Sequence, residues 1–493
     1  MAVFNLSKVY YLYLIAILGF SMSCTKVLAQ GYGQNRLSGT IITEENKAFM
    51  ATHKENIQFF DDSTSRGILE LPIKFHIIRK DDASGGVNIA QLQASLEKLN
   101  EHFLPIYLRF VALPDYNYIN SDYFYQFEKE KEEDLVKKGY LDKTINIYVV
   151  GGIKHEKNNY NAYTYLPTAK NNKDRIFISN KALTDGVSLT RQIGHYLSLY
   201  PTHGTSAEDR ARSDEFADGS NCRTAGDEIC DTPADPRLDG RLVDQRCEYI
   251  GNIQDGNSKF FRPLLNNFMS DNPRLSCVNS FTRQQYARML YAALNIRNYL
   301  SFPKSNFSNK QRKAMEDSYG LSGQVTVLTN GYEVGCDLER NLYRLASKQL
   351  PGTNIKLKIN NSRKCYIYVL EGNNQKDISV YYPLKGDKPF FDEKSPAIEV
   401  PTQGSPILVD DLSQDNNYIA ILFSKKQLPI TEVAKKINEL KNDKLNILQK
   451  IYYVLGNDIV SMNDLTYEKG SVQVSGLTSE RAIIPIFIQY GQN

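Results

Sequence analysis

The hydrophobic positions between residues 68 and 302 follow the periods of strands and helices in turn. Every second residue from Leu69 to Ile77 is apolar, which predicts a strand with one face in the core. From Ile89 to Phe103 the apolar residues recur at three- and four-residue steps behind the cap residue Asn88, which predicts a buried helix. Further strands are expected at residues 106–113, 145–150 and 175–179. The pattern therefore predicts a mixed α/β (α+β) domain.

A helix from Gln284 to Leu300, which begins with a capping box of Thr282 and Gln285, is expected to close this domain. Residues 303–320 are polar and are interpreted as a linker. Beyond them the pattern predicts an all-β sandwich-like domain over residues 321–493, with one long helix from Thr431 to Leu455 against it. Its predicted strands are residues 355–359, 366–370, 378–382, 418–423 and 483–490.

The chain begins with features of an exported protein. Residues 1–29 combine a basic head, an apolar run from Val9 to Met22 and a small-residue ending at Ala29, which predicts a signal peptide. The alternative is a lipoprotein site at Cys24, although the usual leucine three residues earlier is absent. No other run is long and apolar enough to span a membrane, so the mature chain is expected to be secreted or at the cell surface. Residues 30–67 are polar without a clear period and are interpreted as a lead-in or propeptide remnant.

The net charge and the cysteine content restrict the partners and the cross-links that we expect for this protein. The formal net charge of +3 gives no strong field, which argues against nucleic acid or a membrane surface as the partner. Without Cys24 six cysteines remain, an even number that favours disulfides over metal thiolates in an exported chain. They are Cys222, Cys230, Cys247, Cys277, Cys336 and Cys365.

The candidate chemistry lies in residues 189–203. Apolar residues at helical spacing, with Ser188 or Thr190 as a start cap, predict a largely buried helix that stops at Pro201. Arg191 and His195 are four residues apart and share one face of that helix. This is the spacing at which a zinc peptidase helix presents two histidines to one metal, with a glutamate beside the first histidine as the general base.

Residues 191–201, Arg-Gln-Ile-Gly-His-Tyr-Leu-Ser-Leu-Tyr-Pro, resemble the zinc helix of the pappalysin-type metzincin metallopeptidases, H-E-x-G-H-x-x-G-L-x-H. Cys222 and residues 226–234 resemble the Cys and G-D-x-V-x-D-T-P-A segment of that family, and Asn-Phe-Met-Ser around Met269 resembles its Met-turn. Residues 277–289 resemble the cysteine and helix that follow the turn. The resemblance implies a metzincin-like domain. Residues 355–426 are similar to a small bacterial sandwich domain of unknown function.

Carried over onto this sequence, the three zinc ligands of the family fall on Arg191, His195 and Pro201, the catalytic glutamate on Gln192 and the bend glycine on Ser198. A catalytic zinc needs about three protein ligands. An arginine has no lone pair to offer, and a neutral glutamine cannot take a proton from water. We therefore expect neither zinc nor a catalytic residue, and His195 is the sole surviving ligand.

The resulting hypothesis is a catalytically inactive pseudoprotease that binds a protein or peptide partner in its former cleft. The alternative is an active zinc metallopeptidase with a remodelled site, built from His195, His203 and a carboxylate. A third interpretation is a surface structural protein whose buried His195 is only hydrogen-bonded.

Further expectations concern cross-links and cations. Three disulfides are predicted: Cys247 with Cys277, which both occupy family positions, Cys336 with Cys365, and Cys222 with Cys230 by elimination. We expect Arg191 to replace the missing cation by pairing with carboxylates or carbonyls between residues 213 and 235, because an unpaired buried guanidinium would cost several kcal/mol. Asp227 and Asp231 could bind calcium, with turn-stabilising hydrogen bonds as the alternative.

Overall fold

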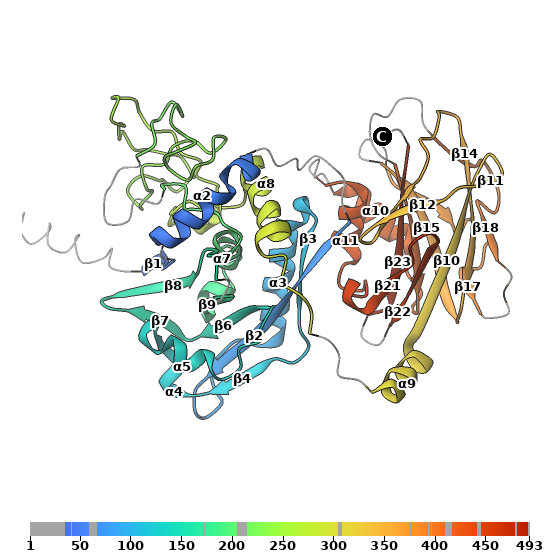
Figure 1. The fold of residues 1–493 in the computed structure, drawn as a ribbon, viewed down its shortest axis with the longest axis horizontal. Coiled ribbons are helices and arrows are strands. Elements are labelled where there is room, and N and C mark those ends of the chain that lie inside the picture. The colour runs from blue at the N-terminus through green and yellow to red at the C-terminus, as the bar shows by residue number, and fades with distance from the viewer. Residues whose placement is uncertain are drawn as a thin grey trace, which may run out of the picture.

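The computed structural model describes residues 35–40, 42–58, 67–170, 173–204, 214–303, 308–373, 377–392, 395, 397–409, 417–440, 445–478 and 481–491. The predicted signal peptide at residues 1–29, with the alternative site at Cys24, lies outside them. Two bodies lie side by side, an α/β part at the left of Figure 1 and a β-sandwich at the right. The predicted fold class is confirmed. No helix within the described ranges is long and apolar enough to cross a membrane.

A nine-stranded sheet organises the described α/β part. Its strands run in the order β3-β2-β6-β9-β8-β7-β5, while β1 pairs with β8 and β4 with β2. The bounds are β1 (Asn35–Ser38), β2 (Leu69–Arg79), β3 (Leu108–Ala112), β4 (Asn117–Asn120), β5 (Gln126–Glu128), β6 (Ile145–Val150), β7 (Gly152–His155), β8 (Asn158–Thr164) and β9 (Arg175–Ser179).

Helices cover both faces of this sheet. The helices are α2 (Glu44–Gln58), α3 (Ile89–Phe103), α4 (Asp122–Tyr125), α5 (Glu132–Val136), α6 (Asn180–Leu183), α7 (Ser188–Tyr196) and α8 (Arg283–Tyr291). One face of β2 and β6 packs with α3 and α7 in the larger core, and the other packs in a second core that includes Tyr148 and Phe177. The expectation that β2 has only one buried face was therefore wrong, because this second core covers its other side.

Most predicted elements of this part are present. The capping box at Asn88 begins α3, and the box of Thr282 and Gln285 begins α8. Residues 30–67, for which no element was predicted, contribute β1 and α2. The pattern did not reveal α2 because the helix is polar and few of its residues, such as Met50, are buried.

Two further sheets form the sandwich, in the orders β18-β14-β10-β22-β21 and β12-β13-β23-β20-β15-β16. Strands β11, β17 and β19 pair with β10, β15 and β14. The bounds are β10 (Gly320–Thr329), β11 (Tyr332–Glu333), β12 (Cys336–Glu339), β13 (Leu342–Leu345), β14 (Asn354–Asn361), β15 (Cys365–Gly372), β16 (Ser379–Tyr382), β17 (Phe390–Phe391), β18 (Ile398–Val400), β19 (Ile407–Leu408), β20 (Asn417–Ser424), β21 (Leu465–Tyr467), β22 (Val472–Leu477) and β23 (Ile483–Tyr490).

The helices of the sandwich part differ from the prediction. The segment expected to be one helix from Thr431 to Leu455 is two helices, α10 (Ile430–Glu439) and α11 (Ile447–Leu455). The second begins with its own capping box, in which Asn446 and Gln449 bond each other's backbone N–H groups. The predicted linker contains α9 (Asn309–Tyr319), which begins at a capping box of Ser308 and Gln311.

Two of the three predicted disulfides are confirmed, Cys222–Cys230 and Cys247–Cys277. The third was wrong, because Cys336 and Cys365 are both free and buried. They lie in β12 and β15 of one sheet, with β13, β23 and β20 between them. Four strand spacings amount to roughly 19 Å, far beyond the reach of a disulfide.

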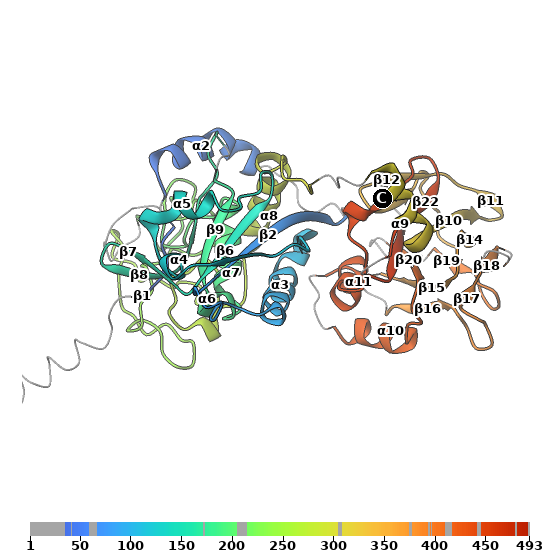
Figure 2. The ribbon, with the colours of Figure 1, turned by 90° about the horizontal axis from the view of Figure 1, so that it is seen from below.

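A buried ion pair joins the two bodies. Arg109 of β3 donates from Nη1 to Glu70 of β2 at 2.5 Å and from Nη2 to the carbonyl of Gly456, beyond α11. The second carboxylate oxygen of Glu70 accepts hydrogen bonds from Ser461 Oγ (2.6 Å) and the Met462 N–H (2.8 Å). Figure 2 shows α11 on the side of the sandwich that faces α3 and β2. The charges of the α/β part are thus satisfied partly by the sandwich.

We predict that Arg109→Ala lowers the free energy of unfolding by roughly 3 to 5 kcal/mol, because it leaves the Glu70 carboxylate buried without its cation. Chemical denaturation followed by circular dichroism measures the effect. Lys98→Ala, which removes an exposed ion pair with Glu101, is the matched control and should change stability little. Equal stability of the two variants would show that the ion pair between Arg109 and Glu70 contributes little to stability.

Candidate functional site

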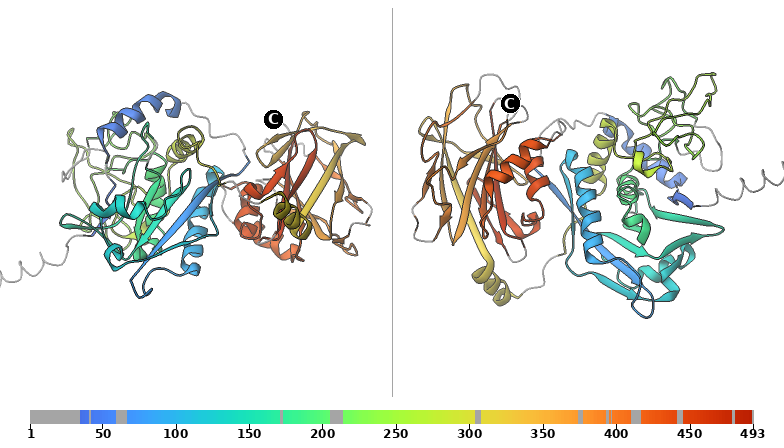
Figure 3. Two further views of the ribbon diagram at one scale, coloured as in Figure 1. Left: turned by 60° about the horizontal axis from the view of Figure 1, so that its bottom comes forward. Right: turned by 180° about the vertical axis from the view of Figure 1, so that it is seen from behind.

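Helix α7 carries the candidate site and lies between the sheet and the irregular chain of residues 214–280 (Figures 1 and 3). Its start differs from the prediction, since Ser188 is the first helical residue, the N-cap residue Val187 makes no side-chain cap bond, and the carboxylate of Asp185 lies at this end of the helix instead. That carboxylate accepts the N–H groups of Val187 (2.8 Å) and Ser188 (2.7 Å). The helix ends at Tyr196, earlier than predicted. Ser198, at the family position of the bend glycine, has a left-handed φ of 78° and turns the chain before Pro201.

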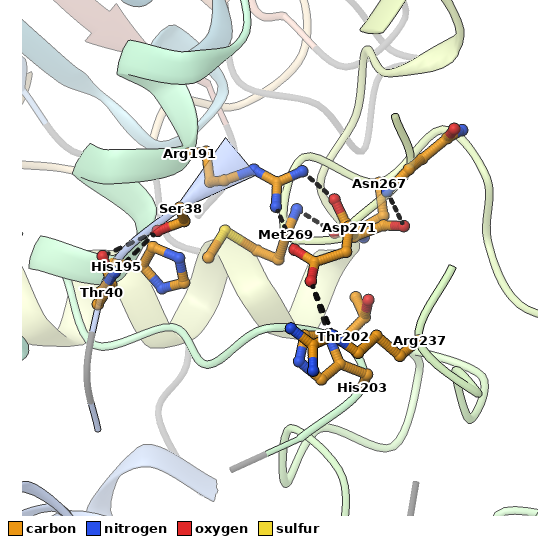
Figure 4. Close-up of polar contacts among 12 residues, drawn as sticks. Ser38, Thr40, Arg191, His195, Thr202, His203, Arg237, Asn267, Met269 and Asp271 are labelled. Carbon is orange, nitrogen blue, oxygen red and sulfur yellow. Dashed lines mark hydrogen bonds and ion pairs between the residues drawn. The ribbon is translucent and has the colours of Figure 1, made fainter. Parts of the chain in front are cut away.

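Arg191 is fully buried on the face of α7 that points to the Met269 loop. Its Nη1 donates to Asp271 Oδ1 at 3.0 Å, and its Nη2 donates to the carbonyl oxygen of Ser270 (Figure 4). The expectation that Arg191 pairs with a carboxylate and a backbone carbonyl is thus confirmed in kind. The expected location between residues 213 and 235 was wrong, because the loop after Met269 lies closer to this face of α7.

Asp271 collects three basic side chains. Besides Arg191, the Nε of Arg237 lies 3.3 Å and the Nδ1 of His203 lies 3.8 Å from Asp271 Oδ2. Burial alone would raise the pKa of the Asp271 carboxyl, but His203, Arg191 and Arg237 together hold that pKa below its usual range. The carboxylate therefore stays ionised and provides the anion that Arg191 needs.

His195, the surviving ligand of the family pattern, is buried one turn beyond Arg191. Its Nδ1 lies 2.9 Å from the carbonyl oxygen of Leu199, which can only accept, so Nδ1 carries the proton. Burial lowers the pKa of His195 to about 4, and the charge of Arg191 contributes to the shift. The imidazole is neutral at physiological pH, with the lone pair on Nε2.

Met269 lies directly beneath this helix. A Cβ atom placed on Gly194 would come within 2.7 Å of the Met269 sulfur, so the glycine permits this close packing. The loop is fixed by Asn267, whose Oδ1 accepts the N–H of Met269 (2.9 Å) and whose amide pairs with Gln285 of α8. The structure therefore brings together the helix and the turn that the sequence pattern selected.

Gln192, at the family position of the catalytic glutamate, faces the N-terminal segment of the chain. Its Nε2 donates to Ser38 Oγ at 3.2 Å, and its Oε1 accepts from Thr40 Oγ1 at 3.1 Å. Ser38 and Thr40 belong to β1 and the residues that follow it, which lie along β8. The general-base position is thus occupied by a neutral amide that is hydrogen-bonded within the chain.

The residues at the positions that correspond to the zinc ligands of the sequence pattern do not fit a zinc ion. Arg191 offers a positive charge and no lone pair, Pro201 has no side-chain donor atom, and only His195 could coordinate. His203 of the alternative remodelled site faces Asp271. Among the residues that the structure describes, no three His, Cys, Asp or Glu side chains are grouped so as to hold a metal ion.

A buried acidic cluster lies in the 214–280 chain. Burial, with the charges of Asp214 and Asp235, raises the pKa of Glu215 to about 8, and burial beside Glu215 raises the pKa of Asp227 well above its usual value. Asp227 Oδ1 accepts the N–H of Ile229 (3.0 Å), and Asp231 Oδ2 accepts the N–H of Gln284 at the start of α8 (2.8 Å). These are the turn-stabilising bonds of the alternative to calcium, and calcium binding stays a prediction.

Sequence reasoning missed three residues of this arrangement. Asp271 directly follows Ser270, the last residue of the Met-turn, but it belongs to no sequence pattern that would single it out. Ser38 and Thr40 lie in a polar segment without periodicity, so the sequence alone did not place them beside Gln192.

We predict that Arg191→Ala lowers the free energy of unfolding by roughly 3 kcal/mol, the lower end for a broken buried pair, because Arg237 and His203 still face Asp271. Asp271→Asn should cost more, since it leaves the buried guanidinium without an anion. Denaturation of both variants beside the parent measures this. Arg241→Ala, at an exposed ion pair with Asp239, is the control and should melt like the parent. An unchanged melting temperature for Arg191→Ala would show that the pair is dispensable.

The acidic cluster predicts a pH dependence. Because the pKa of Glu215 is higher in the folded state than in the unfolded chain, its contribution to stability is fully present below about pH 4.5 and is lost as the pH rises towards about 8. One such group changes stability by at most about 1.4 kcal/mol per pH unit. Unfolding measured between pH 5 and 8 should show a shallower decline for Glu215→Gln than for the parent. Parallel profiles would rule out this origin.

No family model matches the chain, and no curated protein matches it. Among solved structures, a mutant form of promirolysin from Tannerella forsythia is similar to it, with a TM-score of 0.39 and 16% sequence identity over 54% of this chain and 97% of the promirolysin chain. At this level the similarity says nothing about activity.

Proposed function

We propose that the chain is a pappalysin-like pseudoprotease, exported from the cell, that binds a protein or peptide partner and does not hydrolyse it. The observation that carries the proposal is the ion pair between Arg191 and Asp271. A paired guanidinium at this position repels a dication, and it stays in place because Asp271 compensates its buried charge. The helix thus keeps its place beside the Met269 loop without a metal.

Proton transfer is lost together with metal binding. A hydrolytic water needs a base that accepts its proton, and Gln192 has no such capacity because its amide is neutral. His195 has one hydrogen-bonding nitrogen committed to Leu199, and it lacks a partner base. The two disulfides are consistent with secretion into an oxidising compartment.

The binding role is supported by the edge of β8 that β1 covers. Strand β1 already adds to this edge in parallel register, with Ser38 opposite Ala162 and Asn35 opposite Asn159. Main-chain pairing of this kind provides affinity, while side-chain contacts provide selectivity. A partner peptide would use the same edge in place of β1.

The second candidate is an active zinc peptidase with a remodelled site. It would need His195 Nε2, His203 and a carboxylate to converge on one ion. The proximity of His203 to Asp271 is the observation in its favour, at 3.8 Å between Nδ1 and Oδ2. It would also need a new general base in place of Gln192.

We predict that protein purified without added metal contains no stoichiometric zinc and does not cleave casein or gelatin. Elemental analysis measures zinc and, in the same sample, any calcium held by the acidic cluster. The triple variant Arg191→His/Gln192→Glu/Pro201→His should contain more zinc than the parent. A chelator-sensitive protease activity that His195→Ala abolishes would instead establish the remodelled peptidase.

A further inference from the structure

Three side chains at the β1–α7 contact form a closed circuit of hydrogen bonds. Thr40 Oγ1 donates to Gln192 Oε1 (3.1 Å), Gln192 Nε2 donates to Ser38 Oγ (3.2 Å), and Ser38 Oγ donates to Thr40 Oγ1 (3.0 Å). Each hydroxyl also accepts one backbone N–H, from Thr40 itself for Ser38 and from Thr164 of β8 for Thr40 (both 3.2 Å). Each hydroxyl therefore donates once and accepts twice, which is its full capacity.

The circuit requires an amide at position 192. A glutamine offers one donor and one acceptor to two hydroxyls, so the direction of donation can run around the ring. A carboxylate only accepts, so with a glutamate at this position both hydroxyls would have to donate to it, and the hydrogen bond between Ser38 Oγ and Thr40 Oγ1 would lose its donor. Because Gln192 is completely buried, a lost partner there is costly. The residue that excludes general-base catalysis is thus the residue suited to bind two hydroxyl groups.

The residue between the two hydroxyls is restricted as well. A Cβ atom on Gly39 would lie 2.9 Å from Cδ1 and 3.0 Å from Cγ of the Tyr160 ring. Gly39 also donates its N–H to the carbonyl of Ala162 at 2.9 Å, which holds its backbone against β8. A larger residue would have to push the ring of Tyr160 away or break this bond. The contact therefore selects a glycine between two hydroxyl-bearing residues.

We propose that the edge of β8 beside Gln192 recognises a hydroxyl-Gly-hydroxyl motif in an extended peptide that runs parallel to β8, and that β1 occupies this site with Ser38-Gly39-Thr40 until such a partner displaces it. The partner class is a peptide with Ser or Thr on both sides of a glycine. This inference rests on the proposed function, because it names the peptide that the non-hydrolytic protein binds. Gln192 is its specificity-determining residue, and the β8 edge supplies the orientation.

The test uses the mature full chain and the double variant Ser38→Ala/Thr40→Val, which weakens the hold of β1. The probe is a fluorescently labelled peptide with the sequence of residues 35–40, Asn-Arg-Leu-Ser-Gly-Thr. Fluorescence anisotropy should show at least roughly tenfold tighter binding to the double variant than to the parent, because the competing segment has lost the side-chain bonds of the circuit. Thr40→Val alone is the second variant if the double variant does not fold.

Two control peptides test the motif itself. Replacing Ser and Thr of the peptide by Ala and Val, or its Gly by Ala, should weaken binding to the double variant by about tenfold or more. Adding Gln192→Glu to the double variant should weaken the binding of the unmodified peptide. Circular dichroism should show that the fold is retained. These results support the proposal.

Equal binding of all three peptides would overturn the motif, and absence of binding to both β1 variants would overturn the site. Neither result would contradict the proposed pseudoprotease function, which is contradicted only if the protein holds zinc and cleaves a substrate. A peptide that is cleaved instead of bound would show that the proposed function has failed.

Discussion

A single buried guanidinium determines the arrangement of the candidate site. Arg191 projects from α7 towards the loop of Met269, and in that position it must find an anion, because an unpaired buried charge costs several kcal/mol. Asp271 and the Ser270 carbonyl supply the partners, and both lie within two residues of Met269. The helix and the loop are therefore held together directly by protein groups. The packing of Gly194 on the Met269 sulfur follows from the same approach.

This arrangement exchanges one kind of chemistry for another. A metal centre needs neutral or anionic ligands and an open position for water, whereas this site contains a cation, a neutral histidine and an amide. Asp271 pairs with Arg191, Arg237 and His203, so basic side chains of the protein itself compensate its negative charge. Gln192 is likewise occupied by the chain's own hydroxyls. The polar groups that a peptidase would direct at a substrate are directed at other parts of the protein.

The sequence predicted those features that depend on local pattern. The capping boxes at Asn88 and Thr282 are both present, and so is the pairing of Cys247 with Cys277 that the family resemblance implied. Features that depend on non-local contacts were missed or misplaced. Cys336 and Cys365 were paired wrongly because the order of strands within a sheet cannot be deduced from the spacing of residues along the chain. Asp271 was not selected because only the folded loop brings it to Arg191. The capping box of Asn446 and Gln449 could have predicted the start of α11. It was overlooked because apolar residues at helical spacing continue on both sides of it.

Both disulfides lie in the chain of residues 214–280, where the described residues form hardly any helix or strand. Such a segment has few ladder hydrogen bonds to resist local opening, and proteases cut chains where they open. The Cys247–Cys277 bridge spans 30 residues of this segment, including Met269 and Asp271. A single cut inside that loop would leave both new ends covalently joined to the rest of the protein. A protease that cut the chain near Met269 or Asp271 would thus not detach these residues from the rest of the protein.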